Sequence, residues 1–508
     1  MFRLGLTVLK AGSIVFVTAL CLFSQSPSNS VPFTLPPGAA TSFVTCGSPG
    51  SLNTGFAGVL MDAGNTAPDG FELFQFRSNN ILVSEAAVPA SALSLNKELF
   101  VEIGGNVTTG IAIANPNQAA ATISFDFQDP VIRFRGGGVN AGTVTIPPKS
   151  QVAGFINEPP FNSPAPYFGQ MRFVSSIPVA FTSLRGLRNE RSEFIMTTVN
   201  ESDTSRQRGS NVLAPQAVVG YLPLVVDGGG WTTELVLRNP DFDDAAAGML
   251  EFLDSNGDPL SLTINGQSMS TLRYEMQRSD FLRVSTSGAG SNIREGSIRV
   301  TADAHSFAPG LFAIYSFNRA GVTVSMATAP MVQAGKAFRL YVEETGDFPG
   351  QLQAGIVIHN ASPVASSVLL QLTDLNGNAI GISSTVTIPG FGQITKFLRE
   401  IPGFAAMPFP FRGVLRMSTG TMEGIAVQGI RGRYNERSDF IITAVLPSQE
   451  SEEPTEPVSQ LVFPHVALGG GYSTGFVLFN DSGSSSSGNI AGVLRNGLPI
   501  NIQAMCRG

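Results

Sequence analysis

"DGGGWTTELVLRNP" occupies residues 227–240, and "LGGGYSTGFVLFND" occupies residues 468–481. The two stretches lie 241 residues apart (468 − 227 = 241) and share their glycines, an aromatic residue, a threonine and an asparagine. Three glycines followed by alternating apolar residues are typical of a tight turn that enters a β-strand. Because self-similarity at a fixed spacing is the signature of repeat architectures, we expect the chain to be built from repeated units.

Other phrases recur at nearly the same spacing. "LFVE" at Leu99 returns as "LYVE" at Leu340, again 241 residues later (340 − 99 = 241). "RGLRNERSEFI" from Arg185 returns as "RGRYNERSDFI" from Arg431, 246 residues later (431 − 185 = 246). The extra five residues indicate a small gain inside the second unit, offset by a loss in its linker. A double unit of 241 residues therefore recurs across nearly the whole chain.

Each double unit consists of two related halves. The Asn-Gly turn dipeptides at Asn256, Asn376 and Asn496 are spaced 120 residues apart (376 − 256 = 120; 496 − 376 = 120). Asn-Gly between apolar runs is a strong hairpin signal because both residues accept positive φ. We therefore predict an all-β chain of tandem immunoglobulin-like antiparallel β-sandwich modules of about 115–120 residues. The Cys…Trp…Cys signature of true immunoglobulin domains is absent, since Trp231 is the only tryptophan.

Two kinds of module alternate along the chain. A-type modules carry the phrase GGG[WY][ST]T, and B-type modules carry RGxxNERS[DE]F. The predicted order is a signal peptide at 1–26, the C-terminal half of an A-type sandwich at 31–92, a B-type sandwich at 97–205, an A-type sandwich at 218–331, a B-type sandwich at 338–450, and the N-terminal half of an A-type sandwich at 461–508. The acidic, proline-bearing "SQESEEPTEPVS" before the last half module is typical of a linker.

The two A-type halves at the ends of the chain would together make about one module. Half a sandwich leaves an apolar face and strand edges uncovered. The halves could pair within one chain and close a ring of four sandwiches, or pair between chains and give self-association into head-to-tail polymers. A truncated, frayed end is the third possibility. Cys46 and Cys506 lie one in each half, so they are either a disulfide that joins the halves or two unrelated thiols.

The N-terminus is typical of an export signal. Arg3 and Lys10 precede an apolar run from Ala11 to Phe23. This run is short for a bilayer span but fits the core of a signal peptide, and an uncleaved membrane anchor is the alternative. We therefore expect a secreted or cell-surface protein, with no membrane segment beyond the signal.

Composition narrows the class of function. Net charge is −7 and only five lysines occur, so the clustered cations that bind nucleic acid are missing. The three histidines, His305, His359 and His465, show no metal-ligand spacing. No nucleophile elbow, phosphate loop or dinucleotide fingerprint is present. We therefore expect no cofactor, no metal and no enzymatic activity.

The repeated charge-rich phrases supply candidate binding residues. They are Arg185, Glu190 and Arg191 in the first copy, and Arg431, Glu436 and Arg437 in the second. Each phrase stands between two apolar runs, at the place of a hairpin tip, so the favoured interpretation is a solvated turn whose charges pair weakly. The alternative is that these residues dock a neighbouring module or an acidic ligand.

Two further loops allow a functional and a structural interpretation. Trp231 and Tyr472 follow three glycines, so each could stack on a sugar ring or cap the end of a sandwich core. "DSNGD" from Asp254 and "DLNGN" from Asp374 place oxygen ligands at alternate positions, as in calcium loops. No bidentate glutamate follows either phrase, so a polar Asn-Gly hairpin is favoured there.

The arrangement resembles uncharacterised secreted bacterial proteins built from tandem β-sandwich modules with GGGWTT and RGRYNERxDF phrases. The resemblance covers essentially everything after the signal peptide and implies export and a repeat architecture, without an activity. The first functional hypothesis is an exported non-enzymatic protein with a surface, adhesive or scaffold role, partnered by a surface glycan or protein. The alternatives are a carbohydrate- or ligand-binding accessory that uses the GGG[WY] loops, and a hydrolase with a site between modules.

Overall fold

The computed structural model describes residues 30–46, 50–128, 139–199, 201–202, 217–240, 244–278, 280–450, 460–495 and 497–503. The predicted signal segment and Cys506 lie outside these residues. The regular structure consists of strands and two short 3-10 turns, η4 (Leu398–Glu400) and η5 (Phe404–Ala406). The protein is therefore all-β, which confirms the fold class expected from the alternating sequence. Within the described part of the chain, no helix has the length and apolar composition that a bilayer crossing needs.

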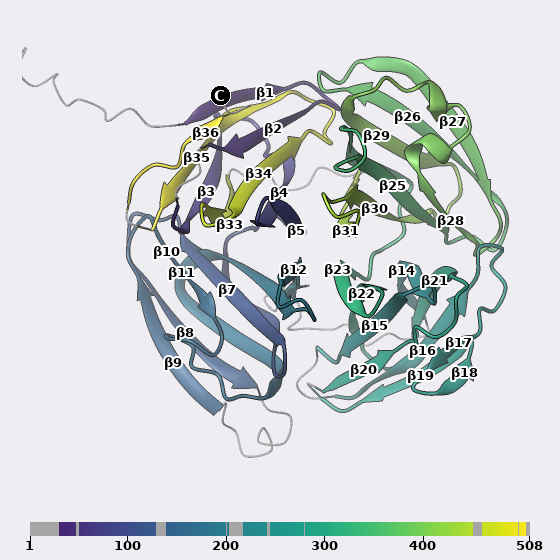
Figure 1. The fold of residues 1–508 in the computed structure, drawn as a ribbon, viewed down its shortest axis with the longest axis horizontal. Helices are drawn as coiled ribbons and strands as arrows, with labels where there is room; N and C mark the ends of the chain where they lie inside the picture. Colours follow the sequence, from purple (N-terminus) through teal and green to yellow (C-terminus); the bar gives the residue numbers. More distant parts are fainter. Residues whose placement is uncertain are drawn as a thin grey trace, which may run out of the picture.

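Four β-sandwiches follow one another around a ring (Figure 1). Sandwich 1 contains β1 (Val31–Leu35), β2 (Ala40–Thr45), β3 (Asn53–Met61), β4 (Asp69–Ser78), β5 (Ile81–Pro89), β33 (Gln460–Leu468), β34 (Tyr472–Phe479), β35 (Ser486–Leu494) and β36 (Ile502–Gln503). Sandwich 2 contains β6 (Ser94–Ile103), β7 (Val107–Asn115), β8 (Ala121–Gln128), β9 (Val139–Ile146), β10 (Ser150–Phe155), β11 (Tyr167–Arg188), β12 (Phe194–Thr198) and β13 (Glu201–Ser202).

The other two sandwiches complete the ring. Sandwich 3 contains β14 (Ala217–Asp227), β15 (Trp231–Arg238), β16 (Ala246–Leu253), β17 (Leu262–Ile264), β18 (Gln267–Met269), β19 (Thr271–Met276), β20 (Phe281–Ser285), β21 (Arg294–Ala302), β22 (Gly310–Arg319) and β23 (Val322–Pro330). Sandwich 4 contains β24 (Ala337–Glu344), β25 (Leu352–Asn360), β26 (Ser366–Asp374), β27 (Ala379–Ile388), β28 (Gln393–Phe397), β29 (Phe411–Thr419), β30 (Ile425–Tyr434), β31 (Phe440–Val445) and β32 (Ser448–Gln449).

All four sandwiches share one strand order. In sandwich 3 the sheets run β14-β21-β16-β19 and β20-β15-β22-β23. In sandwich 4 they run β24-β29-β26-β27 and β28-β25-β30-β31, with β32 added beside β24. Sandwich 2 has the same order, except that the 22-residue strand β11 pairs with β6 and β8 in one sheet and with β7 and β12 in the other. In sandwich 2 the single strand β11 therefore occupies the positions that β29 and β30 occupy in sandwich 4.

Sandwich 1 is built from both ends of the chain. Its sheets run β33-β3-β35-β1 and β36-β2-β34-β4-β5, so every neighbouring pair except β4 with β5 joins an N-terminal to a C-terminal strand. Phe43 of β2 lies directly opposite Phe476 of β34, and both side chains are buried in one core. Of the three arrangements that the sequence leaves open, the structure has the pairing of the two halves within one chain.

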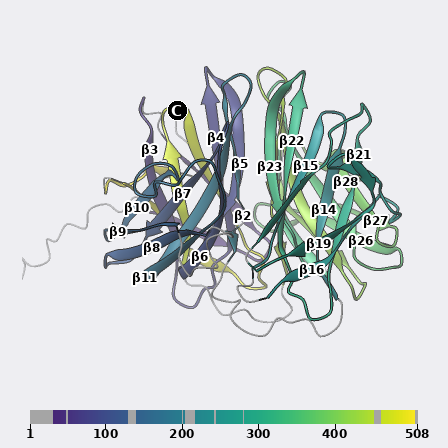
Figure 2. The ribbon, with the colours of Figure 1, turned by 90° about the horizontal axis from the view of Figure 1, so that it is seen from below.

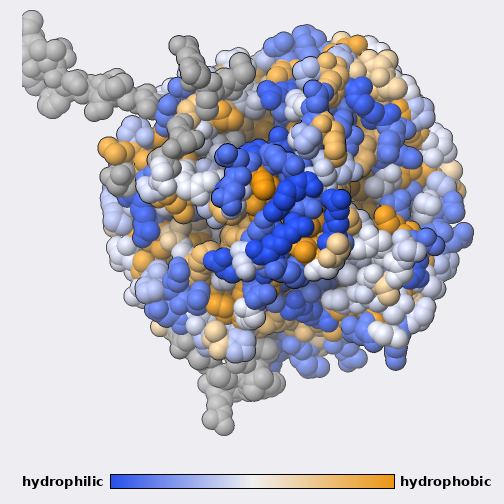
Figure 3. Space-filling model, viewed as in Figure 1, coloured by the Kyte–Doolittle hydropathy of each residue, from blue (hydrophilic) through white to orange (hydrophobic). Residues whose placement is uncertain are grey.

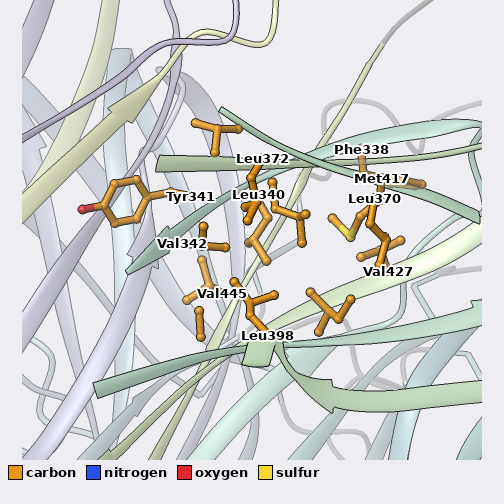
Figure 4. Close-up of a cluster of buried hydrophobic side chains, with 14 of the residues drawn as sticks. Phe338, Leu340, Tyr341, Val342, Leu370, Leu372, Leu398, Met417, Val427 and Val445 are labelled. Atoms are coloured by element: carbon orange, nitrogen blue, oxygen red, sulfur yellow. The ribbon is translucent and has the colours of Figure 1, made fainter. Parts of the chain in front are cut away.

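The sandwich cores follow the two-residue period of the strands. In β26, Val368, Leu370 and Leu372 are buried while Leu369 between them is exposed. Figure 4 shows Leu370 and Leu372 in one cluster with Val427, which comes from β30 of the facing sheet. This inward-facing alternation gives sandwich 4 a continuous apolar interior between its two sheets.

Neighbouring sandwiches also pack face to face, and this packing closes the ring. Phe71 of β4 belongs to the same buried cluster as Tyr341 of β24, with their ring centroids 6.2 Å apart. Val357 of β25 and Ile430 of β30 are buried against sandwich 3. The strands of adjacent sandwiches therefore stand side by side around the axis, with the β4–β5 and β22–β23 hairpins pointing to one side (Figure 2).

Candidate functional site

The innermost strands of the four sandwiches, β5, β12, β23 and β31, meet at the centre of the ring (Figure 1). They are edge strands, and side-chain hydroxyls bridge them. The Ser84 hydroxyl accepts a hydrogen bond from the Met196 amide at 2.8 Å. The Ser325 hydroxyl accepts one from the Ile442 amide at the same distance. Ser325 lies 241 residues after Ser84, and Ile442 lies 246 residues after Met196, so the two bonds are equivalent in the repeat. Hydroxyls thus satisfy strand edges that would otherwise stay unpaired.

At one end of these strands lie two charged hairpin tips, residues 189–193 and 435–439, here named the NERS loops. An asparagine shapes each loop: the side-chain oxygen of Asn189 accepts hydrogen bonds from the amides of Arg191 and Glu193. Its side-chain nitrogen donates to the Thr323 carbonyl of sandwich 3, 3.0 Å away. Asn435 does the same, and it reaches the Leu82 carbonyl of sandwich 1 at 2.9 Å. The loops are hairpin turns, as the sequence predicted, but they also contact neighbouring sandwiches.

The glutamates of the NERS loops bind those same neighbours. Glu190 accepts hydrogen bonds from the amide and the hydroxyl of Thr323, at 2.7 and 3.2 Å. Glu436 accepts one from the Leu82 amide at 2.8 Å and forms an ion pair with Arg77 at 2.7 Å. Each glutamate therefore caps the β-hairpin of the next sandwich around the ring. Both glutamates are exposed, as the solvated-turn interpretation expects, and they also make the contacts with a neighbouring module that the alternative interpretation expects.

The arginines of the NERS loops reach across the axis. Arg191 pairs with Asp439 of the other loop at 2.7 Å, and Arg437 pairs with Glu193 through two hydrogen bonds. Sandwiches 2 and 4 are not neighbours in the ring, so these pairs bridge it. Figure 3, which views this face, shows hydrophilic residues gathered at its centre. Reciprocal ion pairs between the two NERS loops join the two halves of the ring on this face.

Arg185 and Arg431 precede the NERS loops on strands β11 and β30; Arg185 is buried, and the Arg431 side chain is 11% exposed. Arg185 donates to Glu102 at 2.9 Å and also contacts the sulfur of Met326 in sandwich 3. Arg431 donates to Glu85 of sandwich 1 at 2.7 Å and to Glu343 of its own sandwich at 2.8 Å. Both arginines therefore stabilise contacts between sandwiches, because a buried guanidinium needs such partners.

Trp231 and Tyr472 are half-buried and stack on phenylalanines. The rings of Trp231 and Phe317 are 4.6 Å apart, and those of Tyr472 and Phe76 are 4.5 Å apart. Burial raises the pKa of the Tyr472 hydroxyl. One face of each aromatic side chain is therefore covered by its own sheet, which is the packing expected of a core cap.

The threonine of the GGG[WY][ST]T phrase holds the turn closed. The Thr233 hydroxyl donates to the Val226 carbonyl at 2.7 Å and accepts from the Val226 amide at 3.0 Å. Thr474 makes the same pair of bonds with Ala467. The glycines before it have positive φ, and a Cβ on Gly230 would lie 2.3 Å from a backbone oxygen. Backbone geometry therefore accounts for this phrase.

The Asn-Gly turns at Gly257 and Gly377 lie against a neighbouring sandwich. The carboxylate of Asp254 accepts hydrogen bonds from the amides of Asn256 and Asp258. Gly257, with φ of 87°, packs so closely on sandwich 4 that a Cβ would lie 2.0 Å from the Gly390 carbonyl oxygen. No group of three His, Cys, Asp or Glu suited to a metal occurs among the described residues. The structural interpretation of "DSNGD" therefore accounts for its contacts.

Cys46 directly follows β2 in sandwich 1 and is disulfide-bonded. Its amide donates to the Asn501 carbonyl at 2.9 Å, so it lies beside the C-terminal segment of the chain. The other two cysteines, Cys21 and Cys506, lie outside the described residues. The pairing of Cys46 with Cys506 stays a prediction.

A cavity of about 440 Å³ lies at the opposite end of the central strands from the NERS loops. The last residues of β5, β12, β23 and β31 line it, together with Lys97, Thr182 and Thr328. All four sandwiches contribute to this cavity. Cavities at junctions between domains are common places for ligands, so this is one candidate binding site.

Sequence reasoning missed two buried titratable residues. His359 is fully buried and shares a hydrogen bond of 2.9 Å with Ser297 of sandwich 3. Burial lowers the pKa of its imidazole to about 3, so the ring is neutral. Glu72 is also fully buried, neither carboxylate oxygen has a hydrogen-bond partner, and burial raises its pKa well above the ordinary value. Neither residue belongs to a motif, so no sequence signal identifies them.

Comparison with known proteins gives no family for this chain. No protein-family profile matches it, and no curated protein matches it. Among solved structures it is similar to the infectious bursal disease virus VP2 subviral particle, with 8% identity and a TM-score of 0.11 over 96% of this chain and 89% of that chain. It is similar to a structure of the Gx strain of that virus, with 8% identity and a TM-score of 0.12 over 81% of each chain. Similarity at these TM-scores carries no argument about function.

Proposed function

We propose that this protein is an exported, non-enzymatic ring of β-sandwiches that serves as an adhesive or scaffold component at a cell surface. The observation that carries the proposal is the pairing of the two chain ends in sandwich 1. Asn480 of the C-terminal half donates hydrogen bonds to the Leu35 and Pro36 carbonyls of the N-terminal half, at 2.9 and 3.2 Å. A chain fastened to itself in this way is a rigid platform whose loops are held in fixed positions.

The charged residues of the ring support the same proposal. Arg185, Arg431 and the NERS loops each contact other sandwiches of the ring. Their contacts serve assembly, and the apolar run from Ala11 to Phe23 after two basic residues supports export. Self-association through the terminal halves stays a prediction for conditions in which these halves come apart.

Export and adhesion can be tested on the full chain. The gene with its own N-terminus and a C-terminal tag is expressed in a bacterial host, and cytoplasm, membrane and medium are probed for the tag. We expect the tag outside the cytoplasm and an N-terminus shortened by about 26 residues. The purified mature protein is then applied to glycan arrays, immobilised surface proteins and whole cells.

Saturable binding to one of these surfaces supports an adhesive or scaffold role. Retention of the full-length chain in the cytoplasm would contradict export. Turnover of chromogenic glycoside, ester or peptide substrates by the pure protein would replace the proposal by the hydrolase hypothesis.

A further inference from the structure

A cleft of about 400 Å³ lies between sandwiches 4 and 1. Strands β2, β34 and β4 form one wall, and the ends of β24, β29 and β30 form the other. Its polar lining includes Ser42, Gln75, Tyr341, Arg412, Arg433 and Ser473. A volume of this size suits a small molecule, and apolar side chains such as Leu73 line the rest of it.

The corresponding place between sandwiches 2 and 3 is filled by aromatic side chains. The ring of Phe100 lies 5.1 Å from Phe168, 5.9 Å from Phe281 and 5.3 Å from Phe312. The Arg283 guanidinium lies over Phe168, 5.1 Å from the ring centroid. Aromatic side chains therefore occupy the joint between sandwiches 2 and 3, and the equivalent joint between sandwiches 4 and 1 differs from it by its open cleft.

The departure comes from substitutions at equivalent positions on sandwich 1. The register of β2 on β34 matches that of β20 on β15, so Ala40 stands where Phe281 stands and Ser42 where Arg283 stands. Each change removes a large side chain from the joint. The cleft therefore exists because sandwich 1 lacks the groups that fill the space in sandwich 3.

The wall formed by sandwich 4 carries arginines at two positions where the equivalent strand of sandwich 2 carries apolar residues. By strand register Arg412 stands where Phe168 stands, and in the repeated phrase Arg433 stands where Leu187 stands. A chain that only needed to pack two sandwiches together would gain nothing from two such exchanges, because desolvating a guanidinium costs free energy. The two arginines therefore lie at the same joint where Ala40 and Ser42 leave the cleft open.

The positive charge of the arginines in the cleft is only partly balanced by carboxylates. Arg431, at the base of the cleft, is saturated by Glu85 at 2.7 Å and Glu343 at 2.8 Å. Arg412 forms an ion pair with the same Glu343, at 2.9 Å. Three arginines and one glutamate line the cleft, with Glu85 behind them, so positive charge is in excess.

Arg433 is the arginine best placed to take a ligand. Its nearest carboxylate oxygen, on Glu85, is 3.7 Å away, and its Nε donates to the Gly350 carbonyl at 3.4 Å. Burial and the neighbouring Arg431 lower the pKa of Arg433. Its contacts are longer than those of Arg431, so a ligand carboxylate can improve them without breaking a short ion pair.

We propose that this cleft is a binding site for a small carboxylate-bearing sugar, with Arg433 and Arg412 pairing with the carboxylate. The hydroxyls of Ser42 and Ser473 would hydrogen-bond ring hydroxyls, and Leu73 would pack on the apolar face. A bare phosphate or sulfate would use the arginines but would leave most of the volume and the apolar lining unfilled. The site needs both ends of the chain in sandwich 1, and it does not depend on export or on a scaffold role.

Titration calorimetry on the full mature protein tests this site. The probes are glucuronate and galacturonate mono- and disaccharides, neutral glucose, sodium sulfate and sodium phosphate, each up to about 10 mM. We expect the uronic acids to bind and glucose and the inorganic anions to bind at least about tenfold more weakly. Arg433→Leu and Ser42→Arg restore the residues found at the filled joint, and we expect each to weaken uronic-acid binding at least about tenfold.

Arg273→Gln, which removes an exposed ion pair with Asp303 elsewhere on sandwich 3, is the matched control and should leave binding unchanged. Arg412→Gln at a side chain that is 44% exposed gives a second variant whose folding is little at risk, and thermal unfolding of every variant is measured alongside. Three results overturn the proposal: no uronic acid binds, sulfate and phosphate bind as well as the uronic acids, or Arg433→Leu and Arg412→Gln bind as the wild type does.

Discussion

Arg191 and Asp439 form an ion pair across the ring axis, with Nη1 2.7 Å from Oδ2. A second ion pair joins the same two loops in the opposite direction, since Arg437 of the second NERS loop binds Glu193 of the first. Each copy of the charge-rich phrase thus supplies the arginine that the carboxylate of the other copy needs. The repetition of this phrase in a chain poor in charge is explained by a ring that brings its two copies face to face.

The Arg437–Glu193 pair should be coupled more strongly than an ordinary surface pair. Both side chains are half-buried and are joined by two hydrogen bonds. A double-mutant cycle with Arg437→Gln and Glu193→Gln, followed by chemical unfolding, should give a coupling free energy of about 1 kcal/mol. The same cycle on the exposed pair Arg273 and Asp303 should give about half of that or less. Equal couplings in the two cycles would contradict a locking role for the NERS loops.

Asn480 should hold the ring closed, whereas its equivalent Asn239 should act only within sandwich 3. The side-chain nitrogen of Asn480 donates to carbonyls at both ends of the chain, and that of Asn239 donates to three carbonyls of its own sandwich. Replacement by alanine at either position should lower the free energy of unfolding by about 2–4 kcal/mol.

Only Asn480→Ala should also open the ring. Limited proteolysis of the native protein should release the terminal strands of Asn480→Ala faster than those of the wild type, and static light scattering should detect exchanged dimers in concentrated samples. If Asn239→Ala releases the same fragments at the same rate, the two asparagines do not differ in this way.

Periodicity explains why the fold could be read from the sequence. The apolar alternation of strands such as β26 and the Asn-Gly turns depend on neighbours within a few residues, and Gly257 and Gly377 have the positive φ that such turns require. The matching offsets of the GGG phrases also align the two terminal halves. Their strand pairing in sandwich 1 follows that alignment strand for strand.

The contacts of the candidate sites could not be read in the same way. Glu190 and Arg191 are adjacent in sequence but bind different sandwiches, because a hairpin tip at a ring centre faces several modules at once. The cleft beside Arg433 depends on Ser42, far away along the chain. Such pairings are set by the closure of the ring, and no local pattern encodes it.

Cys46 should be joined to Cys506 in the mature protein. Removal of the predicted signal also removes Cys21, which leaves these two cysteines, and Cys46 lies beside the C-terminal segment through its bond to Asn501. Proteolysis without reductant, followed by mass spectrometry, should yield one peptide pair containing both, and reductant should separate it. Cys46→Ser should lower stability by about 2–4 kcal/mol. Recovery of two unmodified thiols from an oxidised preparation would contradict the disulfide.

His359 should make the protein less stable in mild acid. Its folded pKa of about 3 lies below the unfolded value near 6.5, so the unfolded chain takes up a proton first and stability falls as the pH drops below 6.5. The loss should reach about 2 kcal/mol at pH 5. His359→Asn, which can keep the bond to Ser297, should remove this part of the pH dependence in thermal unfolding from pH 7 to 5. His305→Asn at an exposed position should leave it unchanged, and identical pH profiles for wild type and His359→Asn would contradict the prediction.

Glu72 should have the opposite effect, a loss of stability as the pH rises. Its carboxyl is buried in sandwich 1 without a hydrogen-bond partner, so burial raises its folded pKa well above the unfolded one. The contribution of the neutral buried carboxyl to stability is fully present below the unfolded pKa. It is lost as the pH rises from the unfolded pKa through the folded pKa, because in this range the unfolded chain has released a proton that the folded chain keeps. Glu72→Gln stays neutral, so its melting temperature relative to the wild type should rise steadily between pH 5 and pH 8, while Glu275→Gln at an exposed position should show no such trend. A difference between Glu72→Gln and wild type that is constant over this range would mean that the Glu72 carboxylate is ionised in the folded protein.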